Sequence, residues 1–340
     1  MVFCEKIVRI KIMPTNKNIS IILAPFSYGG PNDAAKDGPS ALMKNDLDGD
    51  LRELGFNVKI IKPSRDLINQ ASILVKHKNK KNRIKNIDIV VKINEWLAKT
   101  VADEVKNGYL PLTIGGDHSL AIGTIAGATT NVAAGSIGVL WLDRHFDAHS
   151  PKNTPSWRTH GMPVAVAIGD KKFDSHPDFQ RLLKIGGSSK NIPSVKPENF
   201  VQIAIGEKSY INPPTKWFSM EDIDNLGIKK IIDQALSYLL KRVKYIYVAW
   251  DIDSLNVTGT GTSGDSQLTL REGLVIAREI NKRVRLVNRL IGFEMVEVAP
   301  KLEKPYLKGQ TVDWALQLIT TTFGGNLFNN LSRLKKNIHL

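Results

Sequence analysis

Short apolar runs alternate along the chain with longer stretches in which apolar residues recur at helical spacing. This alternation is typical of βα units arranged around a parallel sheet. Strands are predicted at residues 19–24, 58–61, 110–114, 137–142, 200–205, 245–250 and 290–293. Helices are predicted at residues 40–53, 90–106, 119–128, 229–241, 270–281 and 311–322. Ser40 and Ser119 are predicted to cap two of these helices, because a serine hydroxyl accepts backbone N–H groups at helix starts.

Side chains able to do chemistry follow four of the apolar runs. They are Asp117 and His118, then Asp143, His145 and Asp147, then Asp251 and Asp253, and last Glu294 and Glu297. In open α/β sheets, ligands bind outside the carboxyl ends of the strands. These distant segments are therefore expected to converge on one crevice.

The most specific pattern places Asp143, His145 and Asp147 at alternate positions as a strand ends. Alternate side chains of an extended segment point to the same side, so two carboxylates and an imidazole are expected to face one point. Asp251 and Asp253 repeat this alternate spacing after another apolar run. Carboxylates and imidazoles suit Mn²⁺ or a related divalent ion. Two ions roughly 3.5–4 Å apart would neutralise the repelling acids and share a bridging water.

Each segment also has a simpler interpretation when taken alone. An Asp-x-Asp pair after a strand is commonly a turn or a cap, and His118 by itself could cap a helix. The Asp143–Asp147 pattern favours metal binding more strongly. The occurrence of four such segments in one chain makes a metal centre the preferred hypothesis.

Composition fits a single large domain. The chain has 340 residues, 42% of them hydrophobic, which is enough for one large core or at most two ordinary domains. It contains no run of 18 apolar residues, and its first eleven residues lack the features of a signal peptide. Cys4 is the lone cysteine, so no internal disulfide is expected. We expect a cytoplasmic protein.

The net charge of +14 raises the alternative of nucleic-acid binding. The densest basic run spans residues 76–85 and contains no aromatic side chain that could stack on bases. We therefore expect this run to be a solvated surface loop and expect no nucleic-acid partner.

Taken together, these segments resemble the arginase (ureohydrolase) family, which includes arginases, agmatinases and formimidoylglutamases. The resemblance is carried by Gly115-Gly116-Asp117-His118-Ser119, Asp143-Arg144-His145-Phe146-Asp147 and Asp251-Ile252-Asp253. Supporting stretches are Ala24-Pro25-Phe26-Ser27, Gly38-Pro39, His160-Gly161-Met162-Pro163, Thr260-Gly261-Thr262 and Glu297-Val298-Ala299-Pro300. Ala-Pro-Phe-Ser, and Thr-Pro-Ser before His-Gly, look more like arginase than agmatinase.

The resemblance implies a single αβα-sandwich domain with a mostly parallel sheet over residues 18–330. An N-terminal extension, 1–17, and a basic tail, 331–340, would flank it. It also implies two Mn²⁺ ions per subunit. The ligands of one ion would be His118, Asp143, Asp147 and Asp251. Those of the other would be Asp143, His145, Asp251 and Asp253, so that Asp143 and Asp251 bridge both ions.

Catalytic roles are likewise implied by the resemblance. Asp147 would accept a hydrogen bond from the bridging hydroxide that attacks the guanidinium carbon. Glu297 would hold the substrate guanidinium, since a carboxylate matches that planar cation. His160 would shuttle a proton to the leaving amine. Thr262 is counted among the substrate-binding residues. With L-arginine as substrate, the products would be L-ornithine and urea.

The segments expected to recognise the amino-acid end of the substrate depart from the family pattern. Thr154 and Ser156 keep their places, whereas His149 and Arg158 stand where asparagines are usual. Arg158 would hold a substrate carboxylate more strongly than an amide does. Ser209 stands where a carboxylate for the α-amino group is expected.

A further departure is Arg144, which replaces a usual alanine. Its side chain is expected to point away from the metals and either to pair with a nearby acid or to face a subunit contact.

Several alternatives stay open. The substrate could be another guanidino or formimidoyl compound, such as a guanidino acid, agmatine or formimidoylglutamate. The protein could also be an inactive metal-binding relative, although a full ligand set with Glu297 argues against that. Co²⁺ or Ni²⁺ would fit the same ligands as Mn²⁺. Family members are commonly trimers or hexamers, so a homo-oligomer is expected.

Overall fold

The computed structural model of the protein describes residues 16–74, 82–169, 175–185, 194–206, 212–262 and 267–325. The strands are β1 (Asn18–Ala24), β2 (Asn57–Ile61), β3 (Leu110–Gly115), β4 (Ile137–Leu142), β5 (Phe200–Ile205), β6 (Lys216–Ser219), β7 (Tyr245–Asp251) and β8 (Leu290–Val296). They form one sheet in the order β2-β1-β3-β8-β7-β4-β5-β6, and every pairing between them is parallel. The predicted parallel sheet is confirmed.

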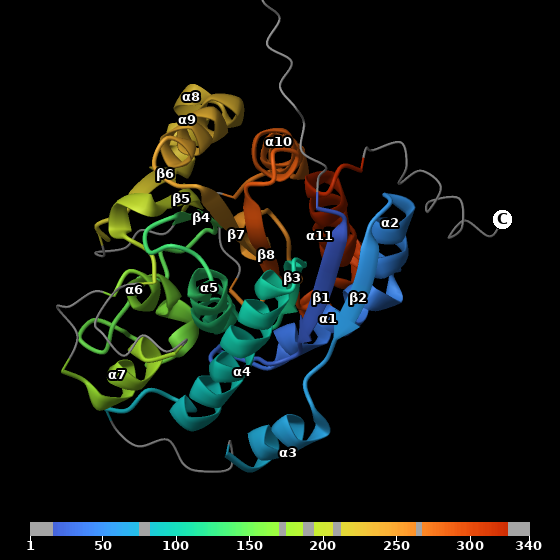
Figure 1. Ribbon diagram of the computed structural model, residues 1–340. Coiled ribbons are helices and arrows are strands. Elements are labelled where there is room, and N and C mark those ends of the chain that lie inside the picture. Colours follow the sequence, from blue (N-terminus) through green and yellow to red (C-terminus); the bar gives the residue numbers. More distant parts are fainter. Residues whose placement is uncertain are drawn as a thin grey trace, which may run out of the picture.

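Helices cover both faces of this sheet (Figure 1). They are α1 (Gly38–Lys44), α2 (Leu47–Glu53), α3 (Arg65–Leu74), α4 (Ile87–Lys106), α5 (Ala121–Thr130), α6 (Pro163–Ala167), α7 (Pro177–Leu183), α8 (Met220–Leu226), α9 (Ile228–Leu240), α10 (Leu270–Ile280) and α11 (Gln310–Thr322). The cores on the two faces contain different helices. Helices α1, α2, α9, α10 and α11 pack on one face, and α3 to α6 pack on the other.

Strand β1 shows why the strands are nearly continuous apolar runs. Its Ile19 and Ile21 belong to the core on one face, whereas Ile22 belongs to the core on the other. A parallel sheet is covered on both sides, so successive residues of a strand are buried in turn. The result is an αβα sandwich, as predicted.

Seven predicted strands are present, and the short edge strand β6 was missed. Its four residues are too few to show alternation, and Trp217 within it is exposed. The helix predicted at 40–53 is wrong as a single element, because the chain breaks it at Asp46, which has a left-handed φ of 66°. Helices α3, α6, α7 and α8 were not predicted.

Both predicted serine caps are wrong. Ser40 lies inside α1, whose N-cap position is Asp37. Ser119 lies inside a short 3-10 turn, His118–Leu120, that precedes α5. The Asp117 carboxylate caps this turn by accepting a hydrogen bond from the Ser119 backbone N–H at 2.9 Å.

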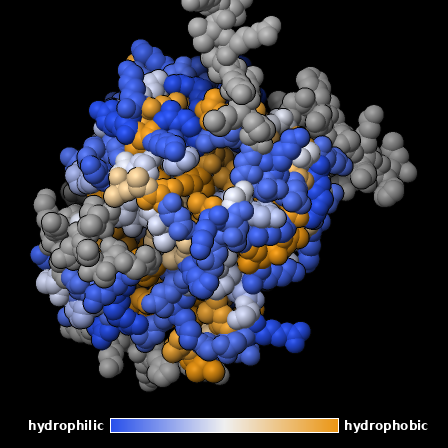
Figure 2. Space-filling model, in the orientation of Figure 1, coloured by the Kyte–Doolittle hydropathy of each residue, from blue (hydrophilic) through white to orange (hydrophobic). Residues whose placement is uncertain are grey.

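The outer surface is mostly hydrophilic in the view of Figure 2, with hydrophobic atoms gathered in smaller patches, one of them over α3. Helix α3 exposes Ile68 and Ile73. None of the helices in the described ranges is long and apolar enough to cross a membrane.

The basic run 76–85 falls largely outside the described residues, but its last part is structured. Ile84 is buried, and the Lys85 backbone N–H donates to the Trp157 carbonyl at 2.8 Å. Arg83 forms a two-pronged salt bridge with the buried Asp178. This end of the run is therefore packed against the fold and is not the solvated loop that was predicted.

Candidate metal centre

The four strands that carry the predicted chemistry lie side by side in the middle of the sheet, in the order β3-β8-β7-β4. His118 follows β3, Asp143 comes directly after β4, Asp251 is the last residue of β7, and Glu297 comes directly after β8. All four strands run in the same direction, so these residues meet at one edge of the sheet. Glu294, which was expected past a strand end, lies inside β8 and is fully buried.

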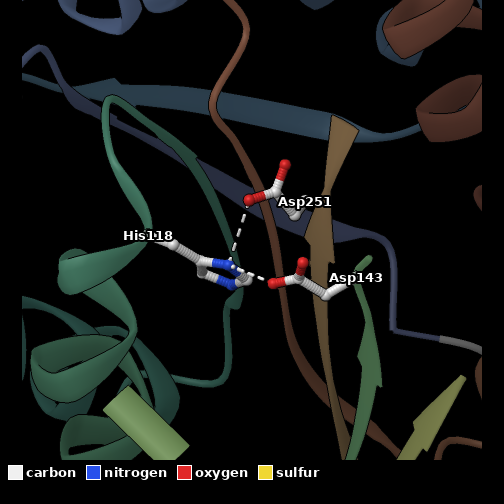
Figure 3. Close-up of side chains that lie close together, drawn as sticks. All are labelled: His118, Asp143 and Asp251. Atoms are coloured by element: carbon white, nitrogen blue, oxygen red, sulfur yellow. Dashed lines mark ion pairs between the residues drawn. The ribbon is translucent and has the colours of Figure 1, made fainter. Parts of the chain in front are cut away.

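The first group of side chains surrounds the Nδ1 atom of His118. This atom lies 2.9 Å from Oδ2 of Asp143, 3.2 Å from Oδ2 of Asp251 and 3.3 Å from Oδ2 of Asp147. Figure 3 shows the imidazole edge facing Asp143 and Asp251. Three segments that are far apart in the sequence thus bring their ligand-type atoms to one point.

A second group lies beside the first and shares Asp143 with it. Nδ1 of His145 lies 3.0 Å from Oδ2 of Asp253 and 3.5 Å from Oδ1 of Asp143. Asp143 turns one carboxylate oxygen toward each histidine, which is the geometry of a carboxylate that bridges two cation positions. The other predicted bridge, Asp251, contacts the first histidine through Oδ2, and its Oδ1 accepts a hydrogen bond from the Asp253 backbone N–H at 2.7 Å.

The donor atoms fit a pair of divalent cations. Nδ1 of His118 is buried and makes no hydrogen bond, although three carboxylate oxygens surround it. A neutral imidazole presents a lone pair there, which the carboxylates repel unless a cation lies between them. Each of the two groups has three such atoms close enough to ligate one ion. Nitrogen and oxygen donors without thiolates suit Mn²⁺-like metals.

Burial and crowding shift the ionisation of these acids. Burial raises the pKa of Asp147 to about 7, and the neighbouring Asp143 charge adds to the rise. Burial also raises the pKa of Asp251 well above its ordinary value, with Asp253 and Asp143 adding to it. Burial alone would lower the pKa of His145, but the charges of Asp253 and Asp143 outweigh it and raise that pKa to about 12. Such shifts mark a crowded group of buried acids that favours positive charge beside it.

The chain reaches this arrangement by turning, and not by continuing strand β4. The His145 backbone N–H donates to Oδ1 of Asp143 at 2.7 Å, and Asp147 adopts a left-handed φ of 48°. The prediction that an extended backbone aligns Asp143, His145 and Asp147 is therefore wrong in mechanism, although their side chains do gather in one region. A left-handed non-glycine residue costs of order 1–3 kcal/mol and is typical of functional sites.

Trp141 supports the first group and was missed by the sequence reasoning. Its indole N–H donates to Oδ2 of Asp143 at 3.1 Å, and its ring stacks on His118 with centroids 3.9 Å apart and planes 7° apart. The signal was present in the sequence: Trp141 stands two positions before Asp143, on the same side of the strand.

Glu297 lies beside the two groups, and one oxygen of its carboxylate accepts a hydrogen bond from the first group's histidine. Its Oε1 accepts the His118 backbone N–H at 3.1 Å, and a Cβ on Gly261 would lie 3.2 Å from its Oε2. Burial raises the pKa of Glu297 well above its ordinary value, and the charges of Asp117 and Asp253 add to the rise. Like Asp147, Glu297 has a left-handed φ, here 61°. Thr262 donates through Oγ1 to Oδ2 of Asp253 at 2.7 Å.

The segment predicted to recognise the substrate forms a tight loop near the centre. The Thr154 hydroxyl accepts the Trp157 backbone N–H at 3.0 Å, and the Ser156 hydroxyl accepts that of Arg158 at 3.2 Å. The Arg158 guanidinium donates to the Gly30 carbonyl. Burial lowers the pKa of His160 to about 4, and the charges of His145 and Arg158 contribute.

Three predicted residues remain to be placed. The His149 backbone N–H donates to the Gly161 carbonyl at 2.8 Å, which ties the two ends of the loop together. Ser209 lies outside the described residues. Arg144 makes no ion pair with any described acid, and its Nη1 is buried without a hydrogen-bond partner.

Comparison with known proteins agrees with this site. Residues 17–324 match the profile of the Arginase family. Arginase-1 of Rattus norvegicus is 36% identical over 319 residues, which cover 91% of this chain and 93% of that protein. The solved structure of arginase from Bacillus caldovelox superposes with a TM-score of 0.78 at 31% identity, covering 92% of this chain and 99% of the other.

A formimidoylglutamase from Bacillus subtilis shares the fold at 18% identity, with a TM-score of 0.66 over 91% of this chain and 87% of its own. The arginase relatives are much more similar in sequence and cover nearly the whole chain. They are hydrolases of the guanidino carbon–nitrogen bond, and their family is metal-dependent. The two adjoining groups of histidine and aspartate lie at the ends of the four central strands, as the sheet order requires. Because the family profile and the arginase relatives match nearly the full length as well, this chain belongs to the arginase family and is a hydrolase of that family.

Proposed function

We propose that the protein hydrolyses L-arginine to L-ornithine and urea, using two Mn²⁺ ions per subunit. The observation that carries the proposal is that two groups of potential metal ligands share Asp143 and lie next to the carboxylate of Glu297. His118, Asp143, Asp147 and Asp251 would hold one ion. Asp143, His145, Asp251 and Asp253 would hold the other.

Bound divalent ions would supply Lewis acidity and lower the pKa of a water molecule enough to make it a nucleophile near neutral pH. The remaining work belongs to the protein. Glu297 has Oε2 turned toward Gly261, where the missing side chain leaves room for a planar guanidinium to pair with the carboxylate. Asp147, whose Oδ2 lies 3.3 Å from Nδ1 of His118, would take up the proton of the attacking water and return it to the departing nitrogen.

His160 is the proposed proton carrier to the leaving amine. Burial keeps the pKa of this imidazole low, at about 4, so it is neutral at physiological pH and would hold a proton only transiently before passing it on. Its backbone N–H donates to the Gly29 carbonyl at 3.2 Å, which fixes the loop that carries it. Transfer from Asp147 to the departing nitrogen and exchange with water through His160 would complete the turnover.

Arginine is proposed over other guanidino compounds because Arg158 introduces a cation into the recognition loop. Thr154, Ser156 and Arg158 lie within five residues of one another and close to His160. A cation there favours a substrate with a carboxylate over agmatine, which has none. His149, Ser209 and Thr262 complete the proposed substrate-binding set.

The test is a substrate panel with the purified protein and added Mn²⁺. Urea release would be measured for arginine, agmatine and a guanidino acid, and formamide release for formimidoylglutamate. We expect arginine to have the highest kcat/KM. A higher kcat/KM for another compound would identify that compound as the substrate and leave the family unchanged. Glu297→Gln is expected to abolish turnover of every guanidino substrate while leaving the Mn²⁺ content at two ions per subunit.

The same proposal includes a cytoplasmic location and a homo-oligomer, trimeric or hexameric. The single cysteine supports a reducing compartment. Light scattering of the purified protein would measure the subunit number.

A further inference from the structure

A group of polar side chains is buried behind the metal centre, on the α5 side of the sheet. We call Thr113, Thr124, Tyr247 and Glu294 the inner polar cluster; none is more than 1% exposed. Thr113 and Glu294 are register partners on β3 and β8, and Thr124 approaches from α5. The cluster is accommodated by the backbone, because a Cβ on Gly292 would lie only 2.6 Å from the Tyr247 ring.

The cluster has more hydrogen-bonding capacity than its own members satisfy. Thr124 donates through Oγ1 to Oε2 of Glu294 at 2.7 Å. Oε1 of Glu294, the Tyr247 hydroxyl and the Thr113 hydroxyl are buried and make no hydrogen bond of normal geometry, although Tyr247 lies near enough to Thr124 and Glu294 for both to shift its pKa. An unsatisfied buried polar group costs about 1–3 kcal/mol. Several unsatisfied atoms gathered at one place indicate that they share a small polar ligand, and an internal water with two to four such partners is the usual one.

The proposed metal ligand His118 has an unsatisfied atom as well. Its Nδ1 faces the carboxylates of the metal centre, whereas its Nε2 is buried and has no partner. A histidine that ligates a metal through one nitrogen generally donates the other N–H to a carboxylate, a carbonyl or a water. Of the four central strands, Glu294 alone presents an unpartnered buried carboxylate oxygen within the described ranges.

Glu294 and His118 lie over the same row of the sheet. Trp141, Ala249 and Glu294 are successive register partners across β4, β7 and β8, and the His118 ring stacks on Trp141. Only the small side chain of Ala249 stands between Trp141 and Glu294 in this row. No direct hydrogen bond joins the two side chains. Each has a buried polar atom without a partner, which one shared water molecule would satisfy.

We propose that Glu294 is a positioning residue for the metal centre: with Tyr247 and Thr113 it holds an internal water that accepts the Nε2–H of His118. The link keeps the proton on Nε2 and leaves the Nδ1 lone pair for the metal. It also fixes the imidazole from the side opposite Asp143, while Trp141 fixes its face. This inference rests on the proposed metal centre and adds a residue that the proposed function does not use.

The inference predicts an effect on metal affinity and not on substrate binding. Loss of such an outer partner typically weakens metal binding 10- to 100-fold. Glu294→Leu removes the acceptor, and we expect the Mn²⁺ dissociation constant to rise by about that factor. KM for the substrate is expected to stay unchanged at saturating Mn²⁺. Glu294→Gln retains one carbonyl oxygen and is expected to recover much of the affinity.

Mn²⁺ binding would be measured directly by calorimetry or electron paramagnetic resonance, without reference to turnover. The matched control is Glu104→Gln, which alters another buried glutamate, one bonded to Ser20 and Lys59 away from the centre. It is expected to bind Mn²⁺ like the wild type. Tyr247→Phe, which removes one partner of the water, is expected to weaken binding severalfold.

A double-mutant cycle shows whether Glu294 acts through His118. In a His118→Asn background, Glu294→Leu, which weakens binding in the wild type, is expected to cause no further loss of affinity. A full additional loss in that background, or wild-type affinity in folded Glu294→Leu and Glu294→Gln, would overturn the inference. Failure of the wild type itself to bind Mn²⁺ would instead overturn the proposed metal centre, which keeps the two outcomes distinguishable.

Discussion

At the scale of single residues, the centre combines backbone strain with buried acids whose mutual repulsion a cation would relieve. Asp147 and Glu297 occupy left-handed backbone conformations, and Asp251 is buried among other acids. Isolated, each of these features destabilises the fold. The carboxylates of Asp143, Asp147 and Asp251 gather around Nδ1 of His118, where they create a concentrated negative potential. These few carboxylates therefore explain the proposed metal affinity.

Asp143 is expected to matter more for metal content than Asp253. Asp143 contacts both histidines, whereas Asp253 contacts His145. Asp143→Asn is expected to lower metal content toward zero ions per subunit, and Asp253→Asn to leave about one, because only the second group is damaged. Elemental analysis after dialysis would measure this. Two retained ions in Asp143→Asn would show that Asp143 is not a bridge.

Arg158→Ala is expected to reduce kcat/KM for arginine by about 10- to 150-fold, because hydrogen bonds to charged groups contribute about 1.5–3 kcal/mol each. The turnover of agmatine, which lacks the carboxylate, is expected to change little. Since Ser209 replaces the acid expected to meet the α-amino group, we also expect weak discrimination against des-amino guanidino acids. Kinetics with all three substrates would measure the effect. An equal loss with agmatine would mean that Arg158 only holds the loop to Gly30.

At the scale of elements, the recognition loop is fastened to the helices beside it. The segment before α4 is joined to α7 by Arg83 and Asp178, and it is joined to the loop by the bond from Lys85 to Trp157. The Asp178 carboxylate also accepts the Ile84 backbone N–H at 3.0 Å. These contacts join the loop that carries the proposed substrate ligands to the segment before α4 and to α7.

Asp178→Asn is expected to lower the free energy of unfolding by about 1.5–3 kcal/mol at pH 7. Burial would raise the pKa of Asp178, but the hydrogen bonds from Arg83 and Ile84 outweigh it and hold the pKa below its ordinary value. A carboxylate with a lowered folded-state pKa stabilises the fold above its unfolded-state pKa, and this contribution is lost as the pH falls through the folded-state pKa. The difference between the two proteins is therefore expected to shrink below about pH 4. Urea unfolding at several pH values would measure it, and a difference independent of pH would contradict this account.

At the scale of the whole molecule, the sheet is the device that assembles the centre. Strands β8 and β7 come late in the chain, yet they lie between β3 and β4. The two groups of ligands therefore form only when segments more than a hundred residues apart assemble correctly. Metal binding and global stability are expected to be coupled, because a metal that binds only the native state stabilises it by mass action.

Removal of metal by a chelator is expected to abolish turnover and to lower the melting temperature. The buried carboxylates lose their compensating charge, and the mass-action term, about 2.7 kcal/mol at a metal concentration of 100 times Kd, is lost as well. Calorimetric melting with and without Mn²⁺ would measure the shift, and re-addition of Mn²⁺ controls for irreversible damage. An unchanged melting temperature after verified metal removal would contradict a metal centre formed by these residues.

The sequence by itself determined the type of fold and the segments of the centre. Short continuous apolar runs such as 137–142, alternating with helical stretches, are typical of strands covered on both faces, and they predict that the polar residues after them lie at the carboxyl edge of a parallel sheet. Those features depend on local pattern. The sequence also contained the neighbour Trp141, two positions before Asp143, although it went unused.

Only the tertiary structure decided which strand ends are neighbours and how the side chains meet. The insertion of β8 and β7 between β3 and β4 depends on long-range packing, which local pattern does not encode. The left-handed turn at Asp147, the break at Asp46 and the burial of Glu294 within β8 have the same origin. Each is a local choice that only the surrounding contacts can stabilise, because the chain alone would adopt a less strained conformation or leave the charge in water.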